Sequence, residues 1–131
     1  MFFALALAGH AQTRLWARGS FTLPMEVEWA KTKLAKGEYR FKVESTSGFG
    51  AIVSVSHKGN IQTFLPYKRE WVRGGKGLRP QLLLHIDPDL SAEVFEMQIP
   101  GPNFRLKFSC RHKKKKGQKA PARATVPLTF N

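Results

Sequence analysis

The feature that most constrains this chain is an alternation of apolar and polar residues with a period of two. Tyr39, Phe41 and Val43 alternate with charged residues, and the same pattern recurs at residues 94–99 and 104–109. Side chains that alternate in this way point to opposite faces of a strand, so each segment predicts a strand with one face in the core and one in water. No stretch has the helical period of 3.6 over enough residues to form a packed helix.

The alternation also assigns side chains to a face. In the strand predicted at 94–99, the side chains expected in the core are those of Phe95, Met97 and Ile99. Those expected in water are Val94, Glu96 and Gln98. Residues 51–56 and 81–86 are more continuously apolar, which favours central strands.

Turn signals separate these segments at regular intervals. Gly or Pro occurs at or near residues 36–37, 47–48, 58–60, 87–89 and 100–103. A spacing of about 10 to 12 residues between turns is typical of an all-β protein. We therefore predict a single antiparallel β-sandwich or flattened barrel of about 7–8 strands.

The formal net charge of +13 is concentrated near the C-terminus. Glu96 is the last acidic residue, and nine Lys or Arg residues follow it. A run of this kind stays solvated and attracts polyanions through counterion release. The predicted polyanion-binding residues are Arg111, Lys113, Lys114, Lys115, Lys116, Lys119 and Arg123, in a basic loop at 111–123. The alternative is a solvated loop without a dedicated partner.

A second basic segment contains aromatic residues. It comprises Tyr67, Lys68, Arg69, Trp71 and Arg73. Aromatic rings interleaved with cations can stack on bases or sugars while the cations hold phosphate. The alternative interpretation places Trp71 over an edge of the core. We treat this segment as a secondary contact.

Several kinds of chemistry find no support in the sequence. The single Cys110 excludes an internal disulfide and a zinc site built on paired cysteines, and its phase predicts a small buried residue. Pro88 interrupts the potential metal ligands His85, Asp87 and Asp89, and no Gly-x-Ser-x-Gly motif is present. We therefore predict no catalytic residue, no metal and no cofactor, and a protein that is not an enzyme.

The N-terminus resembles part of an export signal. Residues 2–8 are apolar, and small residues at Gly9 and Ala11 fit a signal-peptidase site before Gln12. The usual basic n-region is missing, and the alternative is an apolar N-terminal strand that packs on the domain. We interpret residues 1–11 as a signal-peptide remnant and residues 12–131 as one β-domain that is exported to the periplasm or the exterior. No run reaches the length of about 18 apolar residues that a transmembrane helix needs.

The opening of the domain is similar to a known group of proteins. Residues 21–29 read FTLPMEVEW and residues 34–41 read LAKGEYRF. This resembles small, exported, functionally uncharacterised β-proteins of soil bacteria that share an FTLPFEVxW…LPAGxYxF opening. The similarity covers about residues 19–56 and is weaker at residues 92–108. It implies export and a small β fold and no catalytic residues, and the basic insertion before the final strand departs from it.

These observations favour a binding or structural role. The leading hypothesis is a non-enzymatic exported β-domain whose basic residues attach loosely to an anionic envelope component or another polyanion. The second hypothesis is a nucleic-acid-binding β-barrel that uses the basic loop together with residues 67–73. The sequence leaves open the natural partner, the oligomeric state and the order of the strands.

Overall fold

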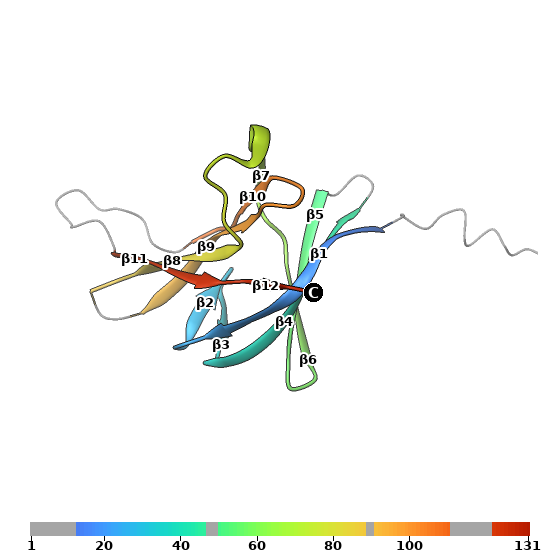
Figure 1. Cartoon of the computed structure of the whole chain (residues 1–131). Coiled ribbons are helices and arrows are strands. Elements are labelled where there is room, and N and C mark those ends of the chain that lie inside the picture. Colours follow the sequence, from blue (N-terminus) through green and yellow to red (C-terminus); the bar gives the residue numbers. More distant parts are fainter. Residues whose placement is uncertain (1–12, 47–49, 89–90, 111–121) are drawn as a thin grey trace, which may run out of the picture.

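The computed structural model of the chain describes residues 13–46, 50–88, 91–110 and 122–131 (Figure 1). Within these ranges the chain forms twelve strands and one short 3-10 helix, η1 (Arg73–Gly75). The seven longer strands are β1 (Thr13–Leu23), β4 (Gly37–Thr46), β5 (Gly50–His57), β6 (Asn60–Phe64), β8 (Gln81–Ile86), β9 (Ala92–Ile99) and β11 (Ala122–Pro127). The five shorter strands are β2 (Val27–Trp29), β3 (Thr32–Leu34), β7 (Lys68–Trp71), β10 (Phe104–Lys107) and β12 (Thr129–Phe130).

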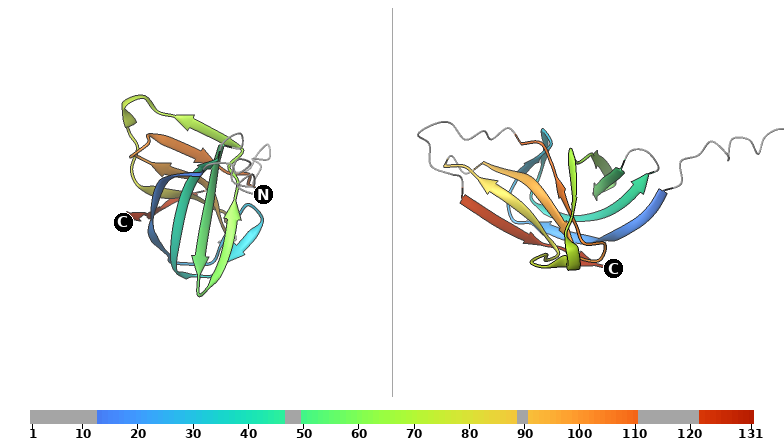
Figure 2. Two further views of the ribbon diagram at one scale, coloured as in Figure 1. Left: turned by 90° about the vertical axis from the view of Figure 1, so that its right-hand side faces the viewer. Right: turned by 90° about the horizontal axis from the view of Figure 1, so that it is seen from above.

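The strands form two sheets that pack into a sandwich (Figure 2). One sheet has five strands in the order β12-β1-β4-β5-β6. The other has seven strands, with the order β11-β8-β9-β10-β7; β2 pairs with β9, and β3 pairs with β2. The prediction of an all-β sandwich is confirmed, and the described strands do not close into a barrel. One pair departs from the antiparallel expectation, because β2 runs parallel to β9.

The core lies between the sheets and is rich in aromatic rings. Trp29 on β2 is completely buried. Its ring stacks on Phe64 with centroids 4.6 Å apart and meets the edge of Phe108 at 5.2 Å. Phe64 belongs to the five-stranded sheet and Phe108 follows β10 of the other sheet, so Trp29 joins the two layers. Stacked and edge-on rings of this kind stabilise a core beyond their burial alone.

The assignment of β9 side chains from the sequence is partly wrong. Val94 is buried in the core, whereas Phe95 is half-buried on the outer face of the sheet. The cause is a β-bulge, since the register between β8 and β9 shifts between Leu83 and Leu84. A bulge adds one residue to a strand and so reverses the alternation beyond it. Met97 and Ile99 are in the core as predicted. Glu96 and Gln98 are on the outer face, but they are buried rather than in water as predicted.

The central strands agree with the sequence pattern, and the C-terminal strands divide between the two sheets. β5 lies between β4 and β6, and β8 lies between β11 and β9, as the apolar runs predicted. Val126 and Leu128 are buried, but the chain leaves one sheet after β11 and joins the other at β12. The signal-peptide interpretation of residues 1–11 concerns a segment outside the described residues.

Candidate anion-binding faces

The predicted basic loop lies largely outside the described residues. Six of its seven proposed contact residues fall in 111–121. Arg123 is described, and it is exposed on β11 at the edge of the seven-stranded sheet. Its guanidinium carbon lies 5.5 Å from the centre of the Phe95 ring, which is the geometry of a cation–π contact.

The structure divides the predicted aromatic and basic segment between two sides of β7. Lys68 and Glu70 point to the outer face, where their charged atoms lie 3.6 Å apart. Arg69 points the other way and lies over the Trp16 and Phe104 rings at 5.3 and 5.1 Å. Trp71 is 59% exposed, and the Arg73 side chain is exposed in η1. The segment therefore does not form one surface on which stacking rings and cations meet.

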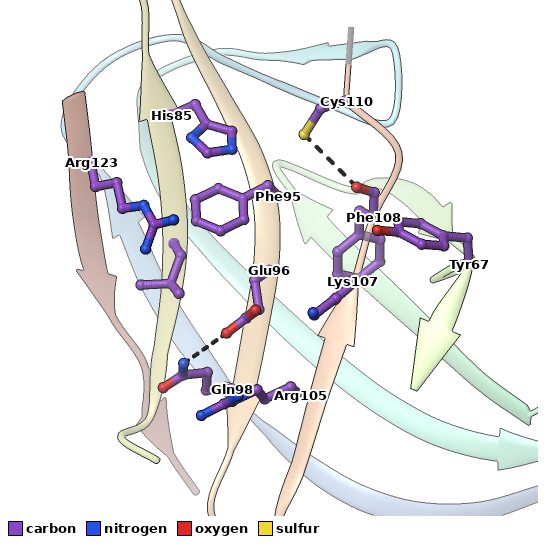
Figure 3. Close-up of a pocket in the computed structure, with 11 residues that line it drawn as sticks. Tyr67, His85, Phe95, Glu96, Gln98, Arg105, Lys107, Phe108, Cys110 and Arg123 are labelled. Atoms are coloured by element: carbon purple, nitrogen blue, oxygen red, sulfur yellow. Dashed lines mark hydrogen bonds between the residues drawn. The ribbon is translucent and has the colours of Figure 1, made fainter. Parts of the chain in front are cut away.

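A hollow of about 600 Å³ lies over β8, β9 and β10 on the outer face of the seven-stranded sheet (Figure 3). We call this surface the seven-strand face. Its charged and polar side chains are Lys68, Glu70, His85, Glu96, Gln98, Arg105, Lys107 and Arg123. Tyr67 stands at its rim beside Phe108, and 67% of the Tyr67 side chain is exposed.

Carboxylates compensate the cations of the seven-strand face. Glu70 lies 3.2 Å from Arg105 and 3.7 Å from Lys107, in addition to Lys68. The positive charge of Lys107, aided by Arg105 and Lys68, lowers the pKa of Glu70 against the opposing effect of desolvation. Glu96, which is opposite Lys107 in the register of β9 and β10, supplies a further acid. Two carboxylates thus oppose four cations on this face, and three of these cations lie beside Glu70.

The floor of the hollow is a hydrogen-bonded chain of buried side chains. Gln98 donates to Glu96 at 2.7 Å (Figure 3) and accepts from the Gln81 amide at 2.9 Å and from the Arg79 backbone N–H at 3.2 Å. Both Glu96 and Gln98 are more than nine-tenths buried. Because the Gln98 amide is anchored at both its oxygen and its nitrogen, this chain holds the Glu96 carboxylate in place on the floor of the hollow.

The cysteine at the rim of the hollow is poorly suited to nucleophilic chemistry. Cys110 is half-buried rather than fully buried as predicted, and its thiol points to the carbonyl oxygens of Val94 and Phe108. Desolvation, with a smaller effect of the negative Glu93, raises the pKa of Cys110 to about 12. The thiolate is the reactive form, so this cysteine is a weak nucleophile at neutral pH.

The outer face of the five-stranded sheet has a different character. The register aligns two rows of side chains across β1, β4, β5 and β6. The first row is Arg18, Lys42, Ser54 and Thr63. The second row is Ser20, Arg40, Ser56 and Ile61. We call these eight residues the five-strand face. It contains three cations and four hydroxyl groups, and neither row contains a carboxylate.

The cations of the five-strand face are almost uncompensated. Arg18 and Arg40 are exposed, and within the described residues neither forms an ion pair. Lys42 has one partner, Glu44, at 3.9 Å, and 54% of the Lys42 side chain is exposed. Arg18 is directly opposite Lys42, a position at which like charges destabilise a sheet. An anion bound between them would relieve this repulsion.

The shape of the five-strand face leaves room for a ligand. A shallow hollow of about 550 Å³ is lined by its three cations and by Ser54 and Ser56, together with Asn131. A neighbouring hollow of about 540 Å³ shares Arg40 and Ser56 and adds Lys36 and Lys58, with Glu38 as its one acid. The positive surface therefore extends along β4 and β5 toward the end of the sheet where these strands turn.

The sequence contained part of the signal for this face. Arg40 and Lys42 occupy outward positions of a clearly alternating strand, and Ser54 and Ser56 alternate with buried Val53 and Val55. The missing information was strand order, which places β1 and its Arg18 beside β4. This face is therefore not visible in the sequence, because charges on separate segments add up only when the segments are neighbours.

The chain was compared with protein-family models, with curated proteins and with solved structures, and none matches. Among the described residues, no cluster of three or more His, Cys, Asp or Glu side chains is placed to hold a metal ion. The same part of the chain contains no helix with the length and apolar character needed to cross a membrane.

Proposed function

We propose that this protein is a non-enzymatic exported β-sandwich that binds anionic polymers of the cell envelope through the five-strand face. The observation that carries the proposal is the group of Arg18, Arg40 and Lys42 on two neighbouring strands, with hydroxyl groups beside them and few carboxylates near them. Arginine and lysine bind phosphate, sulfate and carboxylate groups, and serine hydroxyls can donate to the same oxygens. The basic residues at 111–119 would add to the attraction.

The flatness of the site favours a polymer over a small anion. Neighbouring strands are about 4.8 Å apart and same-face residues along one strand about 6.8 Å apart, so the three cations are spaced to contact neighbouring anionic groups of one chain. Exposed cations contribute little to binding singly, because water and salt screen them. Several of them acting on one polymer release several counterions, which gives measurable affinity at low salt.

The proposal is tested by the salt dependence of polyanion binding. The full chain is titrated with heparin and with long-chain polyphosphate over a range of salt concentrations. In the variant Arg18→Gln/Arg40→Gln/Lys42→Gln, we expect weaker binding and a log–log salt slope shallower by about three, one for each lost cation. The matched control, Lys31→Gln/Lys33→Gln/Lys76→Gln, loses the same charge from exposed positions away from the face and should bind much more nearly like the unaltered chain.

Three outcomes would count against the proposal or change its form. Equal losses in the two triple variants would mean that net charge alone governs binding. Loss of all binding on deletion of residues 111–121 would assign it to the basic loop instead. Tighter binding of single-stranded DNA than of heparin, with quenching of Trp71 fluorescence, would favour the nucleic-acid hypothesis.

Export is tested independently. Mass spectrometry of the native protein should find its first residue at or near Gln12 and should find the protein in an extracytoplasmic fraction. An intact N-terminal segment in a cytoplasmic fraction would contradict export without affecting the binding site.

A further inference from the structure

The edge of the five-stranded sheet at β6 differs from the other sheet edges. Among the strands that the structure describes, β6 pairs with β5 alone, and it contains no charged residue and no proline. Its residues Asn60 to Thr63 are exposed, and 69% of the Ile61 side chain is accessible. Figure 2 shows β6 at the side of the sheet beyond β5.

Every other described edge carries a feature that discourages pairing. β7 contains Lys68, Arg69 and Glu70, and β11 contains Arg123 and Pro127. β3 is three residues long with Lys33 at its centre, and β12 is two residues long. Charges, proline and short length are the usual means by which proteins prevent sheets from joining edge to edge. Their absence from β6 alone indicates an edge that pairs.

Hairpin geometry identifies the backbone groups that are available. The loop between β5 and β6 is Lys58-Gly59, both with positive φ, of 50° and 84°, which fits a two-residue type I′ turn. The pair that closes such a loop, His57 and Asn60, is hydrogen-bonded, so hydrogen-bonded pairs alternate from there along the strands. The N–H and C=O groups of Gln62 then point to β5, whereas those of Ile61 and Thr63 point away from the sheet.

We propose that β6 pairs antiparallel with β6 of a second copy of this chain, with Gln62 opposite the partner's Gln62. In this register Ile61 of each copy exchanges both backbone hydrogen bonds with Thr63 of the other, which uses the groups that point outward. The two β-branched side chains become cross-strand neighbours on the outer face, a favourable pair in sheets. On the inner face the two Gln62 amides lie side by side and can bond to each other.

The pairing makes one binding surface from two. The twofold axis that relates antiparallel copies of one strand is perpendicular to the sheet, so both five-strand faces point the same way. The result is a continuous sheet of two five-stranded halves, with the cations Arg18, Arg40 and Lys42 of each half at either side of the joint. A polymer that spans both halves gains affinity through effective concentration.

Charge sets the strength of the dimer. Two copies with a formal charge of +13 each repel, and a contact of one short strand per copy is smaller than a stable interface. The dimer is therefore weak in the absence of ligand, and a long polyanion neutralises the repulsion and promotes it. This dependence on polyanion rests on the proposed function, whereas the strand pairing does not.

The test is sedimentation of the full chain over a wide range of protein concentration, with and without long-chain polyphosphate. We expect a concentration-dependent dimer that polyphosphate strengthens. Thr63→Lys should abolish it, whereas the matched variant Thr22→Lys adds the same charge to an exposed position of β1 away from the edge and should retain it. Thr63→Pro adds no charge and removes an outward N–H. It should weaken dimerisation by about thirtyfold, because twofold symmetry removes one hydrogen bond from each copy.

Hydrogen exchange locates the contact. In the dimer the amides of Ile61 and Thr63 should become protected, whereas the amide of Gln62, already bonded to β5, should change little. A chain that stays monomeric at the highest concentration with and without polyphosphate would overturn the pairing, as would equal behaviour of the two lysine variants or growth into unlimited oligomers. A dimer that binds no polyphosphate would refute the proposed function and leave the strand pairing intact. A monomer that binds polyphosphate would refute the strand pairing and leave the proposed function intact.

Discussion

The two outer faces of the sandwich both carry cations, but they differ in what surrounds those cations. On the seven-strand face, Glu70 alone lies within 3.7 Å of three basic side chains. On the five-strand face, Arg18 and Arg40 have no ion pair among the described residues, and Lys42 has a single long one. The number of basic residues on a face therefore does not by itself define an anion-binding site. The position of a few carboxylates decides which cations remain available.

Strand position explains why one carboxylate has such influence. Glu70 lies on β7 opposite Arg105 of β10, and Lys68 and Lys107 are its neighbours along and across these strands. A side chain in the middle of such a group reaches several partners at once. On the five-strand face the equivalent central positions hold Arg40 and Lys42, so the pleat of the sheet gathers like charges instead.

The largest effect is expected from breaking the core that supports both faces. Trp29→Ala should lower the free energy of unfolding by about 3–5 kcal/mol, because it removes a fully buried ring that contacts both sheets. Trp71→Ala is the control at an exposed tryptophan, and should change it by no more than about 0.5 kcal/mol. Urea denaturation measures both. Similar losses in the two variants would mean that Trp71 covers the core edge after all.

A smaller effect, on heparin binding, is expected from removing a carboxylate from the seven-strand face so that it resembles the five-strand face. Glu70→Gln leaves Lys68, Arg105 and Lys107 without their shared partner, so this variant should bind heparin more tightly at low salt. Glu44→Gln on the five-strand face removes the partner of one lysine and should produce a smaller gain. Chromatography on immobilised heparin ranks the variants, and an unchanged elution of Glu70→Gln would contradict the role assigned to this carboxylate.

The same variant has a defined dependence on pH. The pKa of Glu70 is lower in the folded chain than its usual value of 4.5, chiefly through Lys107. Its carboxylate therefore stabilises the fold above that value, and the contribution is lost as the pH falls through the lower folded-state pKa. The stability difference between the unaltered chain and Glu70→Gln should accordingly be present at neutral pH and shrink in acid. A difference that grows in acid would contradict this assignment.

The sequence predicted the fold class because side-chain alternation depends on local geometry. Tyr39, Phe41 and Val43 are all buried as their spacing requires. The pattern failed at Phe95, because a bulge changes the phase of a strand without changing its composition. The pattern also could not show that β2 pairs in parallel with β9, because a contact of only two residue pairs produces no recognisable pattern in the sequence of either strand.

The candidate site was less predictable than the fold. A run of lysines near the C-terminus attracts notice in a sequence, whereas Arg18 and Lys42 are 24 positions apart and become neighbours only through the pairing of β1 with β4. Residues 67–73 show the opposite case. They are adjacent in sequence, but the alternation along β7 places their side chains on two different faces. Proximity along the chain is a poor guide to a surface that sheets assemble from distant segments.

The smallest predicted effect sharpens the comparison most directly, because it separates binding from stability. Arg18→Gln removes one of two like charges that are directly opposite, so at low salt it should raise the free energy of unfolding by about 0.2–1 kcal/mol. The gain should vanish at high salt, where the repulsion is screened. Lys33→Gln is the control. Because Lys33 is opposite Glu28, this change should lower the free energy of unfolding at low salt instead of raising it. With saturating heparin the unaltered chain should have a higher free energy of unfolding than Arg18→Gln, because the ligand stabilises the unaltered chain more than the variant. A loss of stability in Arg18→Gln without ligand would mean that Arg18 stabilises the fold. The repulsion between Arg18 and Lys42 would then be too small for a bound anion to relieve.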